Sequence, residues 1–292
     1  MEPSSNSNEP LSGFAGLSPK ESDYKSAMFV ILPVPYDKTS TWVKGADKGP
    51  DALIEASQNM ELYDIETDTE VCRKGIFTDK PVTEDASPEA MVETVKQATL
   101  RHLNNGKIII VLGGEHSVTI GAVYAYKQKF PKLNVLQIDA HTDLREKFEG
   151  SRFNHACVMA RVKEICPIVQ AGVRSMSREE TAAIDPKTCF FAEDMAKDKA
   201  WMKKALSKLA SPLYITIDLD GFDPSIVPST GTPEPGGLQW YEVLEFLKKV
   251  IQTKQVVGFD VVELCPNPSD KSSDFLAAKL VYKLMSYLAL KR

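Results

Sequence analysis

Short apolar runs alternate with longer segments of helical apolar spacing along most of the chain. The runs have the length of single strands, and polar residues rarely interrupt them, as expected of strands buried on both faces. The longer segments repeat apolar residues every third or fourth position, which is typical of amphipathic helices. The strands predicted in this way are 28–32, 107–112, 135–138, 168–171, 213–217 and 256–259.

Predicted helices follow most of these strands. A Ser-Pro pair at 87–88 resembles an N-cap followed by proline in the first turn, which marks the start of one of them. The predicted helices are 51–60, 87–102, 117–130, 155–164, 197–209, 239–251 and 272–288. This alternation predicts one α/β domain at 26–292, with a central parallel sheet and helices on both of its faces.

Two regions give no such pattern. Residues 64–86 are mixed and acidic, and no element is assigned to them. The start of the chain is polar and rich in Ser, Asn and Pro, and it lacks the basic start and apolar segment of a secretory signal. We expect residues 1–25 to form a disordered tail.

Composition narrows the class of partner. The net charge of −5 comes without a long basic block, which argues against a nucleic-acid partner. No apolar run is long enough to cross a bilayer, so no membrane partner is expected. Five scattered cysteines without C-x-x-C spacing indicate reduced thiols and a cytoplasmic protein. Cys157, near the candidate site, is expected to be a small buried packing residue.

Polar residues with metal-binding capacity gather at the ends of four predicted strands. In an open parallel sheet, ligands bind beyond the carboxyl ends of the strands. Alternate residues of an extended chain point to the same side, so Asp139, His141 and Asp143 face one place. The glycines at 113 and 114 allow close backbone approach to such a site. The four strand ends are 113–117, 139–143, 218–224 and 260–263.

The candidate ligands are two imidazoles and four carboxylates. They are too many for one tetrahedral ion and enough for two ions that share bridging carboxylates. Oxygen-rich sets favour Mn²⁺ or Mg²⁺, imidazole favours a transition metal, and the absence of thiolates argues against structural zinc. Two such ions sit roughly 3.5–4 Å apart and share a water that becomes hydroxide near neutral pH. The ligands are His116, Asp139, His141, Asp143, Asp218 and Asp220.

Each motif alone also fits an ordinary structural role. An aspartate at a strand end often caps the next helix, and Asp223-Pro224 is common turn chemistry. Together the motifs favour a metal site, because three of the four histidines lie in or just after these strand ends. The fourth, His102, lies in a predicted helix and is expected at the surface.

Three motifs resemble the signatures of the ureohydrolase family, which includes arginases and agmatinases. They are Gly113-Gly-Glu-His-Ser117, Asp139-Ala-His-Thr-Asp143 and Asp218-Leu-Asp-Gly-Phe-Asp-Pro224. The resemblance runs from about residue 33 to the end of the chain. It implies a three-layer arginase-like fold, two Mn²⁺ ions per subunit, and a homotrimer or homohexamer. The implied reaction is hydrolysis of a guanidino group to urea by a metal-bridging hydroxide.

The resemblance also assigns roles to residues. It implies that His116, Asp139, Asp143 and Asp218 hold one ion. It implies that Asp139, His141, Asp218 and Asp220 hold the other. His155 matches the proton-shuttle histidine of the family, Glu263 the glutamate that binds the guanidinium, and Thr232 a threonine of the same pocket. A carboxylate is suited to the paired N–H donors of a planar guanidinium.

The substrate is less closely defined. Arginases grip the α-amino acid end of their substrate partly with an asparagine where this chain has Arg145, while 154–159 and 230–237 resemble agmatinases. We therefore expect agmatine, cleaved to putrescine and urea in polyamine biosynthesis. Because Arg145 could face a substrate carboxylate, arginine, guanidinobutyrate and formiminoglutamate stay open. Ala160 stands where similar sequences often carry arginine, with no predicted effect.

Two other classes of function stay open at this point. One is a deacetylase-like amide hydrolase, because that group shares the broad fold. The other is a binding or regulatory protein that has lost catalysis. Broken ligand positions would mark the second class, and all six are intact here.

Overall fold

The computed structural model describes residues 13–291, and its centre is one sheet of eight strands. All neighbouring strands pair in parallel, in the order β2-β1-β3-β8-β7-β4-β5-β6. The strands are β1 (Phe29–Val34), β2 (Ile76–Thr78), β3 (Ile108–Gly113), β4 (Asn134–Ile138), β5 (Ile168–Val173), β6 (Cys189–Phe191), β7 (Leu213–Asp218) and β8 (Val256–Val262).

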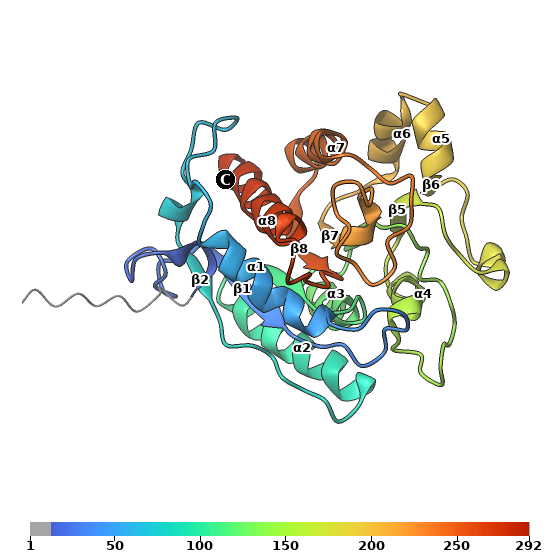
Figure 1. The fold of residues 1–292 in the computed structure, drawn as a ribbon, viewed down its shortest axis with the longest axis horizontal. Coiled ribbons are helices and arrows are strands. Elements are labelled where there is room, and N and C mark those ends of the chain that lie inside the picture. The colour runs from blue at the N-terminus through green and yellow to red at the C-terminus, as the bar shows by residue number, and fades with distance from the viewer. Residues whose placement is uncertain (1–12, 292) are drawn as a thin grey trace, which may run out of the picture.

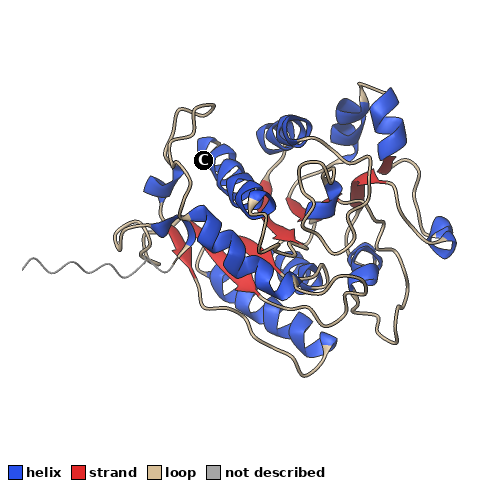
Figure 2. Ribbon diagram, viewed as in Figure 1, coloured by secondary structure: helices blue, strands red, loops and turns tan. Residues whose placement is uncertain are grey.

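Helices cover both faces of this sheet, which gives three layers (Figures 1 and 2). On one face α1, α5, α6, α7 and α8 pack in one apolar core, and on the other α2, α3 and α4 pack in a second. The helices are α1 (Gly49–Ser57), α2 (Pro88–Asn104), α3 (Val118–Lys129), α4 (Val158–Lys163), α5 (Ala192–Lys197), α6 (Trp201–Lys208), α7 (Trp240–Thr253) and α8 (Ser272–Leu290). The predicted α/β fold with a parallel sheet is confirmed.

Strand β3 shows why the apolar runs fold in this way. Ile108, Ile110 and Leu112 belong to the core under α1 and α8, while Ile109 and Val111 belong to the core under α2 and α3. Alternate side chains of a strand leave from opposite faces, so a strand covered on both faces is apolar at nearly every position.

The sequence pattern missed both outermost strands and α5. Strands β2 and β6 have three residues each and are only partly buried, so they carry no long apolar run. The predicted helix 197–209 is observed at Trp201–Lys208, and α5 precedes it as a separate helix. Edge strands of this length are hard to detect, because only one neighbour and one face select their residues.

His102 is buried, so the prediction that it lies at the surface is wrong. Its Nε2 lies 2.8 Å from Asp79 Oδ2, and its Nδ1 lies 3.0 Å from the hydroxyl of Tyr24. Both partners come from segments without a predicted element, which cover the last turn of α2. Helical spacing alone could not show that covering.

Part of the expected N-terminal tail is folded. Residues 1–12 lie outside the described residues, whereas residues 13–25 pack on the domain. Phe14 is buried in the core, and its backbone N–H donates to Thr78 Oγ1 at 2.9 Å. The N–H of Ala15 donates to Ser57 Oγ at 2.7 Å. A buried aromatic side chain and these two bonds fix the segment across β2 and α1.

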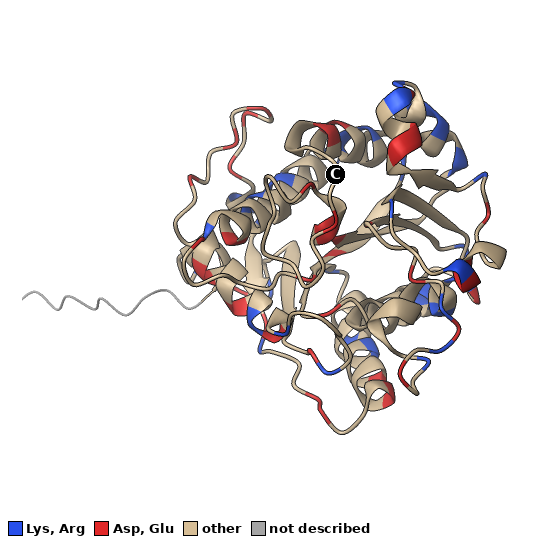
Figure 3. Cartoon of the chain, turned by 45° about the vertical axis from the view of Figure 1, so that its right-hand side comes forward, with Lys and Arg blue, Asp and Glu red and all other residues tan. Residues whose placement is uncertain are grey.

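The remaining expectations from composition concern the cysteine thiols, the charge distribution and the hydropathy of the helices. All five cysteines are free, and Cys157 is fully buried as predicted. Figure 3 shows basic and acidic residues interspersed over the outer helices and loops. Within residues 13–291, no helix combines the length and the hydropathy that a bilayer span requires.

Candidate functional site

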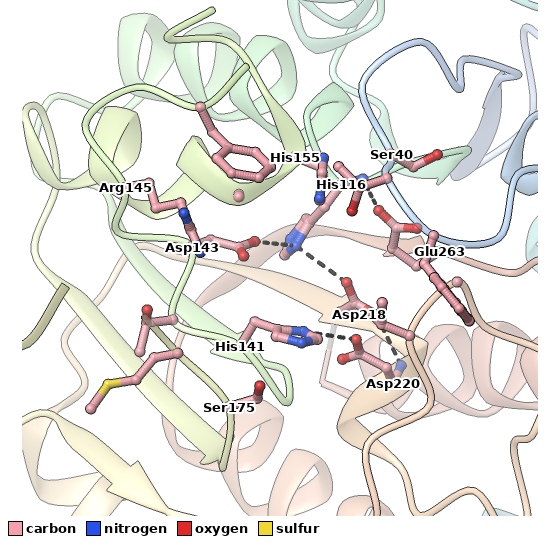
Figure 4. Close-up of a pocket in the computed structure, with 18 of the residues that line it drawn as sticks. Ser40, His116, His141, Asp143, Arg145, His155, Ser175, Asp218, Asp220 and Glu263 are labelled. Atoms are coloured by element: carbon pink, nitrogen blue, oxygen red, sulfur yellow. Dashed lines mark hydrogen bonds and ion pairs between the residues drawn. The ribbon is translucent and has the colours of Figure 1, made fainter. Parts of the chain in front are cut away.

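The carboxyl ends of β3, β4, β7 and β8 lie side by side at one edge of the sheet, and the candidate ligands meet there (Figure 4). The pocket above them has a volume of about 300 Å³. Its wall includes His116, His141, Asp143, Asp218 and Asp220 of the predicted ligands. The structure therefore brings the four predicted strand ends to one place.

Gly114, directly after β3, lies against another loop of the protein. A Cβ on Gly114 would lie 2.1 Å from the carbonyl oxygen of Tyr36, so only glycine fits. The N–H of Gly114 donates to Val34 at 2.8 Å, and the N–H of Glu115 donates to Tyr36 at 2.8 Å. The expected close approach therefore fastens the loop after β3 to the loop after β1, next to the pocket.

His116 is the centre of an inner group of ligands. Its Nδ1 lies 2.9 Å from Asp143 Oδ2, 3.1 Å from Asp139 Oδ2 and 3.4 Å from Asp218 Oδ2. The imidazole is only 1% exposed. Ligand atoms of His116, Asp139 and Asp218 all lie within 4.8 Å of one another, close enough to share one ion.

His141 is the centre of an outer group. Its Nδ1 lies 2.9 Å from Asp220 Oδ2 and 3.6 Å from Asp139 Oδ1, and its side chain is 27% exposed. Ligand atoms of Asp139, His141 and Asp220 also lie within 4.8 Å of one another. Asp139 thus belongs to both groups, as expected of a bridging ligand, whereas Asp218 belongs to the inner group alone.

A buried hydroxyl group and a buried carboxylate behind it orient His116. Its Nε2 lies 2.8 Å from Thr216 Oγ1, and Thr216 in turn donates to Asp260 Oδ1 at 2.6 Å. Tyr214 and Thr119 also donate to Asp260. Because the threonine proton goes to Asp260, the threonine oxygen accepts from Nε2–H. The lone pair of Nδ1 then points at the three aspartates, as a metal ligand requires.

The electrostatics of these groups fit a cation. Within residues 13–291, the buried Nδ1 of His116 has no hydrogen-bond partner although three carboxylates surround it. Burial and the charge of Asp139 raise the pKa of Asp143 to about 7. Burial and the charge of Asp220 raise the pKa of Asp218. Buried carboxylates of this kind require neutralisation, and the donor set of four carboxylates and two imidazoles fits Mn²⁺.

Glu263 lies beside the inner group, at the end of β8 (Figure 4). Its Oε1 accepts the backbone N–H of His116 at 2.7 Å. Burial and the charge of Glu115 raise its pKa well above the ordinary value. Glu263 and Asp143 have positive φ angles of 66° and 51°. Such a backbone costs about 1–3 kcal/mol per residue and is found most often at functional sites.

His155 and Thr232, whose roles are predicted from the family resemblance, also line the pocket. His155 begins a 3₁₀ turn, His155–Cys157, and the ring of Phe148 meets its imidazole edge-on at 6.1 Å. Burial lowers the pKa of His155 to about 4, so its imidazole is neutral at pH 7.

Arg145 reaches the pocket, but other groups engage its charge. Its Nη1 lies 3.1 Å from Glu179 Oε1 and its Nε 3.7 Å from Glu180 Oε2. The guanidinium lies 4.4 Å above the ring of Phe148. Glu180 is itself held by Ser177 and by the N–H of Leu144. The arginine is therefore part of a neutralised wall.

Sequence reasoning missed several residues that hold the ligands in place. Asp260 and Glu115 stood inside recognised motifs, but nothing in a linear pattern indicated that each binds a threonine hydroxyl from elsewhere. Sequence reasoning also assigned no role to Trp42, which lines the pocket and is 77% exposed. The contacts with the threonines join segments far apart in the chain, so only the folded structure could reveal them.

Comparison with known proteins identifies the family of this chain. The arginase family model matches residues 27–286. The chain is 42% identical to the N(1)-aminopropylagmatine ureohydrolase of Synechocystis sp. and 35% identical to the agmatinase of Pyrococcus horikoshii. These matches cover 90% and 91% of this chain, and 90% and 94% of those proteins.

A solved structure gives the same answer in three dimensions. The crystal structure of agmatine ureohydrolase of Thermoplasma volcanium superposes with a TM-score of 0.84 at 31% identity, over 92% of this chain and 93% of that one. The predicted arginase-like fold is therefore confirmed. With relatives of this kind over nine-tenths of its length, the chain belongs to the arginase family and is a ureohydrolase.

Proposed function

We propose that this ureohydrolase uses two Mn²⁺ ions to hydrolyse the guanidino group of agmatine, giving putrescine and urea. One observation carries the proposal: two His–Asp groups share Asp139 directly beneath a pocket that Glu263 and His155 also line. A binuclear site next to a guanidinium-binding carboxylate and a proton carrier contains each part that the reaction needs.

The six predicted ligands would hold the ions. His116, Asp143 and Asp218 would hold the inner ion, His141 and Asp220 the outer ion, and Asp139 both. The family resemblance assigns Asp218 to both ions as well. When bound, the pair of ions supplies a strong nucleophile from water at neutral pH. The ions also balance the charge of the four buried aspartates, which without cations would destabilise the folded state.

Glu263 would bind the guanidinium. One of its oxygens accepts the N–H of His116, and a carboxylate has lone pairs left for two parallel N–H donors. The backbone bond fixes the plane of the carboxylate. The guanidinium plane is fixed in turn, and its central carbon is directed toward the floor of the pocket.

His155 would carry the proton to the leaving amine. Its imidazole is neutral at pH 7, because burial lowers its pKa, so it can accept a proton during attack and return it as the C–N bond breaks. The amine then leaves as an ammonium ion, which cannot re-attack the product.

The neutralised Arg145 supports a substrate without a carboxylate. Its pairs with Glu179 and Glu180 leave the wall without a free positive charge for arginine or guanidinobutyrate. Agmatine ends in an ammonium group, which does not need a free positive charge in the pocket wall.

N(1)-aminopropylagmatine is the second candidate. The relative that is 42% identical carries this substrate in its name. The rim of the pocket also exposes apolar surface, at Trp42 (77%) and Met176 (41%), where the methylenes of a longer polyamine tail could pack. Hydrolysis would release urea and the corresponding triamine.

The deciding experiment offers the Mn²⁺-loaded protein both substrates beside arginine, guanidinobutyrate and formiminoglutamate, and measures urea, or formamide for the last. We expect the two carboxylate-free guanidines to have kcat/KM values about 100-fold or more above the rest, because an unpaired buried carboxylate costs several kcal/mol. Preference for a carboxylate substrate would contradict the proposal. No activity on any of them, with metal bound, would favour the deacetylase-like alternative.

Three finer expectations stay predictions. They are the homotrimer or homohexamer, the cytoplasmic location and the place in polyamine biosynthesis. Light scattering of the purified protein tests the first of them directly.

A further inference from the structure

Two histidines at this site have the same kind of neighbour: a threonine hydroxyl that donates to a buried carboxylate. We propose that Thr39, held by Glu115, is a positioning residue that fixes His155 as the tautomer with its proton on Nδ1. Nε2 then presents its lone pair to the reacting groups. This inference rests on the proposed role of His155 in proton transfer.

The first step is the contact between Thr39 and His155. The backbone N–H of His155 donates to Thr39 Oγ1 at 2.9 Å, and His155 Nδ1 lies 3.4 Å from the same oxygen. Thr39 is in the loop after β1, and His155 lies 116 positions further along the chain. One hydroxyl thus contacts both the backbone and the ring of His155.

The second step is the contact between Thr39 and Glu115. Thr39 Oγ1 donates to Glu115 Oε1 at 2.7 Å, and the backbone N–H of Thr39 donates to Glu115 Oε2 at 2.6 Å. Ser117 Oγ also donates to Oε1. Glu115 is fully buried, so these protein donors replace the water that a carboxylate needs.

Counting donors and acceptors then determines the tautomer. A threonine hydroxyl has a single proton, and here Glu115 accepts it. The oxygen of Thr39 can therefore only accept from His155, so Nδ1 must carry the ring proton. A neutral imidazole has one ring proton, and Nε2 is left bare.

The same arrangement at His116 supports this reasoning independently. There Asp260 accepts the proton of Thr216, and Thr216 accepts from Nε2–H. The bare nitrogen is then Nδ1, which faces the aspartates. The two threonines thus set opposite tautomers: one prepares Nδ1 of His116 as a ligand, the other prepares Nε2 of His155 as a proton acceptor.

The tautomer matters for the order of proton transfer. A proton from the attacking water moves to Nε2 and forms an imidazolium, whose Nδ1–H stays bonded to Thr39. As the C–N bond breaks, the Nε2 proton moves to the nitrogen of the leaving amine, and His155 returns to its neutral starting tautomer. With the proton on Nε2 at the start, the first transfer has no acceptor. A wrong tautomer costs about 10⁴-fold in kcat in a serine protease triad.

The test reads the tautomer directly by ¹⁵N NMR of full-length, histidine-labelled protein, with diamagnetic Zn²⁺ in place of Mn²⁺. The chain has four histidines, and the spectrum of His155→Gln assigns the signals of His155. We expect a protonated Nδ1 and a bare Nε2. A protonated Nε2 in the unsubstituted protein would overturn the inference.

Glu115→Gln provides an opposite prediction. The N–H of Thr39 needs an acceptor at the Oε2 position, so the amide oxygen of Gln occupies it and the NH₂ group faces Thr39 Oγ1. Thr39 then accepts from the amide and turns its proton toward His155. We expect the proton of His155 to move to Nε2, and an unchanged tautomer would count against the role of Glu115.

Activity separates positioning from a merely structural role. We expect Thr39→Val to lower kcat about tenfold or more with little change in KM, and Thr39→Ser, which keeps the hydroxyl, to restore it. Equal loss in both variants would contradict the inference. The two proposals fail differently: absence of urea release in the unsubstituted protein rejects the function, whereas the NMR result stands without any turnover.

Discussion

The inner and outer halves of the candidate metal centre have similar ligands and very different surroundings. His116 is 1% exposed, and Thr216 and Asp260 hold it from behind. His141 is 27% exposed, and among residues 13–291 the carboxylates within 4.0 Å of its ring nitrogens are those of Asp139, Asp220 and Glu234. The inner half is thus built into the sheet, while the outer half faces the pocket.

This difference indicates that the inner position binds its ion more tightly, whereas the outer position is open to substrate and water. A histidine ligand is oriented in advance when its other ring nitrogen is held by buried hydrogen bonds, and this raises its affinity for the metal. A ligand in contact with the pocket leaves room for substrate and water. We therefore expect the ion in the outer position to dissociate first when a chelator is added.

Asp139→Asn removes a residue that belongs to both ligand groups. Asp139 lies 3.1 Å from His116 and 3.6 Å from His141, so both positions lose an anionic ligand and charge balance together. We expect both ions to be lost and urea release to fall to background, the largest effect of all. Elemental analysis after gel filtration measures it, and two retained ions would rule out the bridge.

His155→Ala leaves both halves intact. The histidine lines the pocket and is not among the ligand groups, so we expect full metal content and a kcat lowered by roughly 10²–10⁴-fold. Elemental analysis and single-turnover kinetics check the two parts separately. Release of manganese by this variant would show that the assigned role is wrong.

Thr216→Val tests the inner half by removing the hydroxyl group that orients His116. The variant removes the acceptor of His116 Nε2–H and one donor to Asp260, so we expect about 10–100-fold weaker binding at the inner position. The two ions should then leave at similar chelator concentrations. Thr216→Ser keeps the hydroxyl and serves as the control, which should restore stepwise loss.

Glu179→Gln changes the wall on the pocket side, where the expected effect is smallest. It frees one N–H of Arg145, and because the pair is exposed its energy is about 1 kcal/mol or less. We expect kcat/KM for guanidinobutyrate to rise a few-fold relative to agmatine. Glu146→Gln, a change at a carboxylate that pairs with Arg152 and Arg161, is the matched control. If the ratio of kcat/KM for guanidinobutyrate to that for agmatine is the same in both variants, Arg145 does not determine substrate specificity.

The sequence predicted the central strands and the ligands for the same physical reason. A strand buried on both faces is apolar at most positions, and a ligand at its end interrupts that run abruptly, as Asp139 does after Ile138. The edge strands β2 and β6 lack this signal, as do His102 and Asp260, whose surroundings come from distant segments. Periodicity describes the neighbours along one element, whereas these residues are defined by neighbours across the fold.

The place of β8 in the sheet has a consequence for biosynthesis. This strand is the last of the eight in the chain, yet it lies between β3 and β7, near the middle of the sheet. Until it emerges from the ribosome, the nascent chain has two separate half-sheets with open edges, which are templates for aggregation. Parallel pairing between distant segments is also slow. Chain termination before β8 therefore produces aggregation-prone fragments, and chaperone demand should be highest just before β8 emerges.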